Sequence, residues 1–197
     1  MEEKKTNIFL VRHGQTVWNS QKRWQGNKNS DLTALGIEQA YQTKNIVDKY
    51  EIHNAYVSPL KRAKDTIKII LEDKDIEINV LNEIKEINLG PWEGKKQEET
   101  SLLYAREFDN FWNAPELFDL NGAETFKELQ NRVIKGLNYI FTTHEGCNVL
   151  VVSHWISIKV ALAYYKNLPL SFLPNIQNPK NAELLCITKS NSQIAVK

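Results

Sequence analysis

Two short apolar runs that end in polar residues decide the fold class of this chain. Residues 8–14 have the sequence IFLVRHG, and residues 149–154 have the sequence VLVVSH. Fully apolar runs of this length are typical of strands that are buried on both faces of a parallel sheet. Each run leads directly into a histidine. Parallel strands would therefore bring His13 and His154 to one edge of the sheet, beyond its carboxyl ends, where open α/β sheets bind their ligands.

Weaker strand candidates and helical segments fill the rest of the chain. The further strand candidates are Ala55–Val57, Ile76–Leu81, Ala182–Thr188 and Gln193–Val196. Apolar residues at helical spacing predict one helix face made of Ile37, Ala40, Tyr41, Val47 and Tyr50, and another made of Phe126, Leu129, Val133, Leu137 and Ile140. Strand and helix alternate, which predicts a three-layer α/β/α sandwich with a mostly parallel central sheet, formed by residues 1–197 as a single domain.

Local signals place the ends of two helices. Thr125 and Glu128 have the spacing of a capping box, and His144 lies where the same helix should end. Ser58 and Pro59 predict the start of another helix, as cap and first-turn residue, which continues to about Leu71.

Composition and charge exclude several classes of protein. The 197 residues are 42% hydrophobic and 25% charged, which is typical of globular domains and excludes disorder, collagen and coiled coil. The net charge of +1 gives no basic field for nucleic acid or an anionic membrane. Met1–Thr6 is charged and no apolar run approaches the ~18 residues of a membrane span, so a cytoplasmic protein is expected. Cys147 and Cys186 lack zinc-site spacing and are expected to be reduced, and the sequence does not say whether they lie close together.

Cations at a predicted helix start suggest an anion site. Lys61, Arg62 and Lys64 lie in or near the first turn that follows Ala55–Val57, where the helix dipole disfavours each cation by ~0.3–1 kcal/mol. A phosphate would relieve this conflict, because it accepts from free backbone N–H groups and from a guanidinium fork. Lys61 and Lys64 are interpreted as solvated surface charges, whereas the role of Arg62 cannot be judged without the motif around it.

An ordered series of motifs between residues 8 and 154 resembles the histidine phosphatase superfamily, the cofactor-dependent phosphoglycerate mutase-like proteins. The series comprises LVRHGQTVWN at 10–19, QG at 25–26, LTxxGxxQA at 32–40, SPLxRA at 58–63, EIxxGxWEG at 86–94, GxET at 122–125 and VSH at 152–154. An arginine, histidine and glycine in a row would be a weak signal, whereas the whole series in order is a strong one.

The resemblance implies a phosphohistidine mechanism. His13 would be the nucleophile, held neutral by charge repulsion from Arg12 and Arg62. The same two arginines would neutralise the equatorial oxygens of the transferring phosphoryl group, so no metal and no other cofactor is expected. Glu86 would be the acid that protonates the leaving group; Glu83 competes for this role but lacks the continuation GxWEG.

Further residues of the motifs are expected to bind the substrate. His154, expected to be protonated, would donate to the phosphate together with Asn19 and the backbone N–H of Trp155. The family pattern adds Gln25 and Gly26 to this set. The family usually has a small residue after its second histidine, so Trp155 is a departure that puts the substrate specificity in doubt more than the activity. His53 and His144 have no such context.

The interval between the motifs favours a phosphatase. Glu86 and His154 are 68 positions apart, too short for the segment with which mutases of this family cover their substrate. Residues 95–121 contain six acids against three cations, and an acidic lid would suit neither a bisphosphate nor a carboxylated sugar acid. We therefore expect a hydrolase of small-molecule phosphomonoesters. A mutase and a non-catalytic phospholigand-binding or protein-binding module remain alternatives, and a homodimer is compatible with the sequence.

Overall fold

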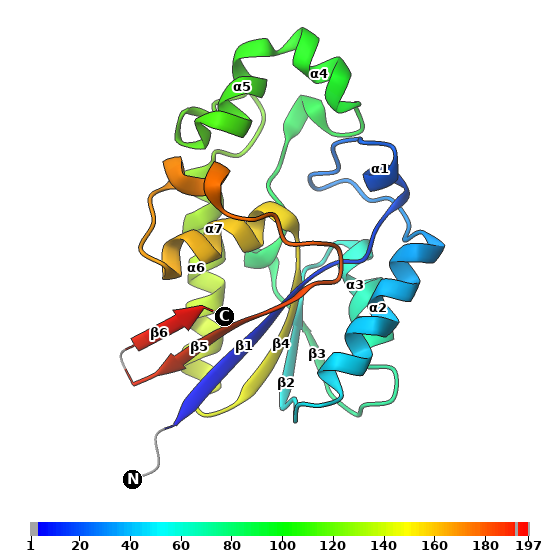
Figure 1. Cartoon of the computed structure of the whole chain (residues 1–197), viewed down its shortest axis with the longest axis vertical. Helices are drawn as coiled ribbons and strands as arrows, with labels where there is room; N and C mark the ends of the chain where they lie inside the picture. The colour runs from blue at the N-terminus through cyan, green and yellow to red at the C-terminus, as the bar shows by residue number, and fades with distance from the viewer. Residues whose placement is uncertain (1–3, 192, 197) are drawn as a thin grey trace.

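The structure is a computed structural model that describes residues 4–191 and 193–196. In this part of the chain, six strands form one sheet in the order β3-β2-β4-β1-β5-β6 (Figure 1). They are β1 (Lys5–Arg12), β2 (Asn54–Val57), β3 (Ile78–Val80), β4 (Asn148–Ser153), β5 (Leu184–Ser190) and β6 (Gln193–Val196). β1 to β4 are parallel to one another, and β5 and β6 add antiparallel strands beside β1. The predicted mostly parallel central sheet is confirmed.

Helices cover both faces of this sheet (Figure 1). α2 (Ala34–Val47) and α3 (Lys61–Ile70) pack on one face, and α6 (Phe126–Thr143) and α7 (Trp155–Tyr165) pack on the other. Successive residues of β1 alternate between the two cores: Ile8 and Leu10 belong to the core under α6 and α7, whereas Phe9 and Val11 belong to the core under α2 and α3. Every residue of the run is therefore buried, which is why it is apolar without alternation.

A group of short helices lies beyond the carboxyl ends of the strands (Figure 1). We call residues 95–121 the lid segment; it contains α4 (Gln97–Leu103), α5 (Ala105–Asn113) and η3 (Pro115–Leu117). The remaining elements are α1 (Val17–Ser20), η1 (Asn82–Ile84), η2 (Gly90–Trp92) and η4 (Leu170–Asn175). Trp92 is fully buried and packs against the rings of Trp24, Phe111 and Phe118, with ring centroids 5.2, 5.7 and 5.4 Å away. This aromatic cluster ties the lid segment to the rest of the fold.

Two helix predictions differ from the structure. α3 begins at Lys61 after the N-cap Leu60, so Ser58 is not the cap; its hydroxyl is instead committed to His154, 2.7 Å away. On α2, Ile37, Tyr41 and the following Tyr50 are exposed by 42–43%, and the buried positions are Gly36, Ala40, Thr43 and Val47. Small side chains face inward there because α2 packs closely on its neighbours.

Other local predictions agree with the structure. Thr125 and Glu128 form the capping box of α6, with reciprocal side-chain to backbone bonds, and His144 is its C-cap. Cys147 and Cys186 are free and pack beside the two different cores. In the described residues, no helix has the length and apolarity that a membrane crossing requires.

Candidate active site

The carboxyl ends of β1, β2 and β4 converge on one pocket of about 270 Å³. Of the residues predicted from the sequence to act in the site, those that line it are Arg12, His13, Asn19, Gln25, Gly26, Arg62, Glu86 and Trp155. His154 lies behind this wall, fully buried, with its ring centroid 5.2 Å from that of His13. The fold thus brings all nine predicted residues together.

His13 is buried and its hydrogen bonds define its tautomer. Nδ1 lies 2.8 Å from the carbonyl oxygen of Gly14, so the ring proton is on Nδ1. Nε2 accepts a hydrogen bond from Arg62 Nε at 3.2 Å, so Nε2 is unprotonated and carries the in-plane lone pair. Burial, and then the charges of Arg62 and Arg12, lower the pKa of His13 well below its usual value. His13 is therefore a neutral imidazole with its nucleophilic nitrogen facing a guanidinium.

Backbone carbonyls hold Arg62 in place. Its two terminal nitrogens donate to the carbonyl oxygens of Lys28 and Gly26 at 2.6 and 2.7 Å. Gly26 has φ +51, a left-handed conformation that glycine adopts without strain, and this turn presents the carbonyl to Arg62. Burial lowers the pKa of Arg62 to about 10, so its guanidinium is charged at neutral pH. By contrast, Lys61 is exposed and paired with Asp31 and Asp65, as a surface charge should be.

Arg12 supplies the second guanidinium. One terminal nitrogen donates to the carbonyl oxygen of Pro179 at 2.8 Å, and the group lies 5.8 Å from the ring centroid of Trp155. Its Nε is buried and has no hydrogen-bond partner among the described residues. Burial lowers the pKa of Arg12 to about 10, so it also remains a cation. Arg12 therefore has a free donor within a charged, desolvated group.

The prediction that His154 is protonated does not agree with its surroundings. Burial, and then the charge of Arg62, lower the pKa of His154 well below its usual value. Ser58 Oγ lies 2.7 Å from Nε2 and also accepts from the backbone N–H of Leu60 at 3.3 Å. Nδ1 is buried and has no hydrogen-bond partner among the described residues. A neutral imidazole carries one ring N–H group, so His154 keeps one donor.

The Glu86 carboxylate lies at the N-terminus of α7. Oε1 accepts from the backbone N–H groups of Ile87 and Ser157 at 3.0 and 3.2 Å. The Ser157 hydroxyl lies 3.2 Å from Oε1 and 2.6 Å from the carbonyl oxygen of Lys85, so its one proton is directed mainly to Lys85. Oε2 accepts from the backbone N–H of Ile156 at 3.2 Å. The N-cap residue of α7, His154, makes no side-chain cap bond. The Glu86 carboxylate therefore caps the helix by accepting from its first free N–H groups. The alternative acid, Glu83, is not among the described residues that line the pocket.

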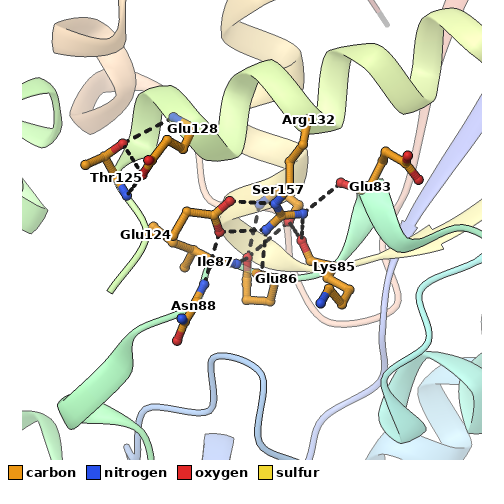
Figure 2. A network of polar contacts seen from close by, with 10 residues as sticks. All are labelled: Glu83, Lys85, Glu86, Ile87, Asn88, Glu124, Thr125, Glu128, Arg132 and Ser157. Atoms are coloured by element: carbon orange, nitrogen blue, oxygen red, sulfur yellow. Dashed lines mark hydrogen bonds and ion pairs between the residues drawn. The ribbon is translucent and has the colours of Figure 1, made fainter. Parts of the chain in front are cut away.

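A hydrogen-bonded network surrounds the backbone of residues 83–88 (Figure 2). Arg132, on α6, donates to the carbonyl oxygens of Glu83, Lys85 and Glu86, and to both carboxylate oxygens of Glu124. The sequence had marked Glu124 only through the GxET motif and had given no signal for Arg132. A search for basic residues one or two turns after that motif would have found it.

The chain that follows η4 also holds the site, and sequence reasoning missed it. Asn181 Nδ2 donates to the carbonyl oxygen of His13 at 3.1 Å, and the carbonyl of Pro179 holds Arg12. Asn178 Oδ1 accepts from Trp155 Nε1 at 3.0 Å and from Lys159 Nζ at 2.9 Å. These residues lie more than 160 positions from β1, in a stretch that the sequence shows only as a long connection.

Asn19 lines the pocket, whereas the described acidic residues of the lid segment do not. Asn19 forms a capping box with Thr16 at the start of α1 through its Oδ1, and its expected hydrogen bond to the phosphate stays a prediction. Gln97 and Phe111 of the lid segment line the pocket. In the described part of the chain, none of the six acidic residues of the lid segment lines it. The acidic composition of the lid segment therefore carries no information on which substrates the pocket accepts.

The family model of the histidine phosphatase superfamily (branch 1) matches residues 8–197. The chain belongs to this superfamily. Its sequence is 35% identical over 157 residues to the uncharacterized phosphatase PhoE of Bacillus subtilis, covering 80% of this chain and 76% of that protein. It is 32% identical over 152 residues to phosphoserine phosphatase 1 of Hydrogenobacter thermophilus, covering 77% and 72%.

Other members of the superfamily extend the comparison. The chain is 31% identical over 167 residues to the probable phosphoglycerate mutase GpmB of Salmonella choleraesuis, covering 82% of this chain and 75% of that protein. Among solved structures, Bacillus stearothermophilus YhfR superposes with a TM-score of 0.94 at 32% identity, covering 97% of this chain and 95% of that one. The relatives thus include phosphatases and phosphoglycerate mutase-like proteins.

Proposed function

We propose that this protein hydrolyses phosphomonoesters of small metabolites through a phosphohistidine at His13. The observation that carries the proposal is the arrangement around this neutral, buried imidazole. Its Nε2 lone pair faces Arg62, Arg12 lines the same pocket with an Nε–H that has no partner among the described residues, and the ring centroid of His154 lies 5.2 Å from that of His13. A bound phosphate would accept from the two guanidinium groups and present its phosphorus to Nε2.

In the first step, His13 Nε2 attacks phosphorus and the bond to the leaving oxygen breaks. The proton stays on Nδ1 and is donated to the carbonyl oxygen of Gly14, which orients the ring. Arg62 Nε donates to Nε2 in the free enzyme, and this hydrogen bond shifts to an equatorial phosphoryl oxygen when the substrate binds. Arg12 and Arg62 offset the charge on these oxygens, so the proposal needs no metal ion.

Glu86 supplies the proton that an alkoxide leaving group needs. Oε1 accepts from two backbone N–H groups and Oε2 accepts from one, so Oε2 is the oxygen with more room to carry the acidic proton. After the leaving group departs as an alcohol, Glu86 is a carboxylate and removes a proton from water. That water attacks the phosphohistidine, which releases phosphate and restores His13.

Trapping the phosphoenzyme tests this proposal. We expect a ³²P-labelled substrate to label the protein on a rapid alkaline quench, and the label to be lost in acid, as for a phosphoramidate. His13→Asn should remove both label and turnover, and EDTA should leave the activity of the wild type unchanged. Turnover by His13→Asn, or an acid-stable label, would falsify the mechanism. Tight phosphate binding without turnover of any ester would favour a binding module.

A phosphoglycerate mutase is the second candidate, because the relatives include proteins with that name. Both reactions form a phosphohistidine and differ in the acceptor, which is water in a phosphatase and a second hydroxyl in a mutase. The products from 3-phosphoglycerate separate them. A phosphatase releases inorganic phosphate in step with glycerate, whereas a mutase yields 2-phosphoglycerate with little phosphate release. The same assay with phosphoserine and with aryl and sugar phosphates would define the substrate class.

A further inference from the structure

Glu86 lies in a stretch of chain that has no regular structure of its own. η1 ends at Ile84 and η2 begins at Gly90, so no helix or strand ladder fixes the backbone that carries the carboxylate. A proton donor is effective only when its oxygen lies within hydrogen-bond reach of the leaving atom. The groups that hold this backbone therefore decide where the acid sits.

Arg132 commits its whole guanidinium to this task (Figure 2). One terminal nitrogen donates to the carbonyl oxygens of Glu83 and Lys85, both at 2.7 Å. The other donates to the carbonyl oxygen of Glu86 at 2.9 Å and to Glu124 at 2.8 Å, and Nε donates to Glu124 at 2.6 Å. These bonds use the five N–H groups that an arginine has. A lysine, with three donors on one nitrogen, could not reproduce them.

Glu124 holds the other side of the same stretch. Its Oε2 accepts from the backbone N–H of Asn88 at 3.2 Å, and its own backbone N–H donates to the carbonyl of Asn88 at 2.8 Å. The side chains of Arg132 and Glu124 are exposed by 23% and 16%, so their ion pair is partly protected from water. Together the two residues fix the main chain on both sides of Glu86, while Arg132 touches Glu86 only at its carbonyl oxygen.

We propose that Arg132 and Glu124 are positioning residues that aim the Glu86 carboxyl group at the leaving oxygen. The inference rests on the proposed function of Glu86. The carboxylate itself contacts α7, whereas its backbone is held chiefly by Arg132 of α6 and Glu124 of the GxET loop. The hydroxyl of Ser157 adds a bond to the Lys85 carbonyl at 2.6 Å, and that of Ser153 adds one to the Ile84 carbonyl at 2.8 Å. The Arg132–Glu124 pair thus helps to set the position of the acid relative to His13, which follows β1. A misplacement of about 1 Å is enough to cost ~10²-fold in rate.

The expected signature is a dependence on the leaving group. Alkyl phosphates need a proton on the leaving oxygen, whereas 4-nitrophenyl phosphate leaves as a stable anion. Arg132→Lys and Glu124→Gln should each lower kcat/KM for an alkyl phosphate by ~10- to 100-fold, and for 4-nitrophenyl phosphate by less than ~3-fold. Glu124→Gln keeps the size of the side chain but replaces its carboxylate with a neutral amide. This variant tests the same role if Arg132→Lys folds poorly.

Two matched controls separate this role from general changes of charge. Arg106 makes an exposed ion pair with Glu107, and Glu128 caps α6 near Glu124 without contacting the residue 83–88 backbone. Arg106→Lys and Glu128→Gln should leave the ratio of the two substrates unchanged. Melting temperatures of all variants report loss of stability. Equal losses on both substrates in Arg132→Lys and Glu124→Gln would mean that the pair is merely structural.

A double variant ties the effect to Glu86. Adding Arg132→Lys to Glu86→Gln should cause no further loss on the alkyl phosphate, because no acid remains to be positioned. Losses that multiply would overturn the inference. If Glu86→Gln itself shows no leaving-group dependence, the acid role of Glu86 fails and the positioning role fails with it. If Glu86→Gln shows that dependence and neither Arg132→Lys nor Glu124→Gln does, only the positioning role fails.

Discussion

Two parts of the pocket are built in different ways, and the proposed mechanism assigns one to the phosphate and the other to the leaving group. In the first part, which we call the phosphate side, His13, Arg12 and Arg62 are each held by a backbone carbonyl, of Gly14, Pro179 and Gly26 respectively. In the second part, which we call the leaving-group side, Trp155, Leu89 and Phe111 line the pocket. Trp155 packs against the rings of Trp112 and Phe111 at 5.5 and 6.4 Å.

The difference separates two tasks. Hydrogen bonds to main-chain carbonyls have narrow geometry, so the phosphate side can recognise one group with fixed shape and charge. Apolar contacts are less directional, so the leaving-group side accepts shapes that fit its aromatic walls. Substitutions on the phosphate side should therefore affect all substrates alike, and those on the other side should discriminate between substrates.

The largest effect is expected from Arg62→Met. It removes a cation that faces the equatorial oxygens, so kcat/KM should fall by about 10³-fold for alkyl and aryl phosphates alike. Arg62→Lys should rescue only part of the loss, because an ammonium cannot match the guanidinium fork. Steady-state kinetics across a series of leaving groups measure this, and melting curves report the cost of leaving the carbonyls of Gly26 and Lys28 without their donor. A loss confined to one class of leaving group would break the comparison.

Glu86→Gln tests the boundary between the two sides. The amide keeps the shape of the side chain but cannot donate the acidic proton. We expect kcat/KM for an alkyl phosphate to fall by about 10²- to 10³-fold and that for 4-nitrophenyl phosphate to change much less. Equal losses would assign the proton to another group, and Glu83→Gln would be the next variant to measure.

The burial of two neutral imidazoles on the phosphate side predicts a pH dependence of stability. His13 and His154 have folded-state pKa values below the unfolded value near 6.5, because burial and Arg62 disfavour their charged forms. At pH values between the folded and unfolded pKa values, the unfolded state binds more protons than the folded state. The contribution of these histidines to the free energy of unfolding is therefore fully present above pH ~6.5 and falls as the pH decreases.

Each buried histidine should contribute a slope of up to about 1.4 kcal/mol per pH unit below pH 6.5. Urea unfolding between pH 5 and 7 measures how the free energy of unfolding changes with pH. His154→Gln should lower this slope by the amount that one buried histidine contributes. His144 also has a lowered pKa through burial, so His144→Gln is the matched variant away from the site. A slope that is unchanged in His154→Gln would show that His154 is charged in the folded protein.

The smallest effect is expected from Trp155→Gly on the leaving-group side. Loss of stacking should raise KM for aryl or nucleoside-like phosphates by about 5-fold and leave small sugar phosphates unchanged or improved. Trp155→Phe keeps a ring but loses the Nε1 donor to Asn178, and so separates stacking from the hydrogen bond. A large fall in melting temperature with equal effects on all substrates would show that Trp155 is structural.

Much of the site could be predicted because it follows local rules. The run at residues 8–11 is apolar throughout since both sheet faces are covered, and the residue after such a strand lies at the binding edge. That rule points to His13 and His154 without any resemblance to a family. The motif series adds Arg62 and Glu86, Trp155 departs from the family pattern, and all three line the same pocket.

Protonation and long-range support could not be predicted in the same way. His154 was expected to be charged, because a sequence does not show how completely a side chain is buried or that Ser58 lies beside it. Arg132 lies 46 positions from the Glu86 carbonyl that it holds, and Pro179 lies 167 positions from Arg12. No periodicity or spacing connects residues so far apart, so only the packed chain shows these contacts.

The sequence by itself determined the parallel sheet, its edge and most of the side chains that meet there. Burial patterns and strand ends are local properties, and they leave a trace in consecutive residues. The tertiary structure alone decided which way the lid segment turns its charges, that both histidines are neutral and what holds Glu86. These depend on desolvation and on hydrogen bonds between distant segments, which exist only once α6, α7 and the stretch after η4 have packed around the strand ends.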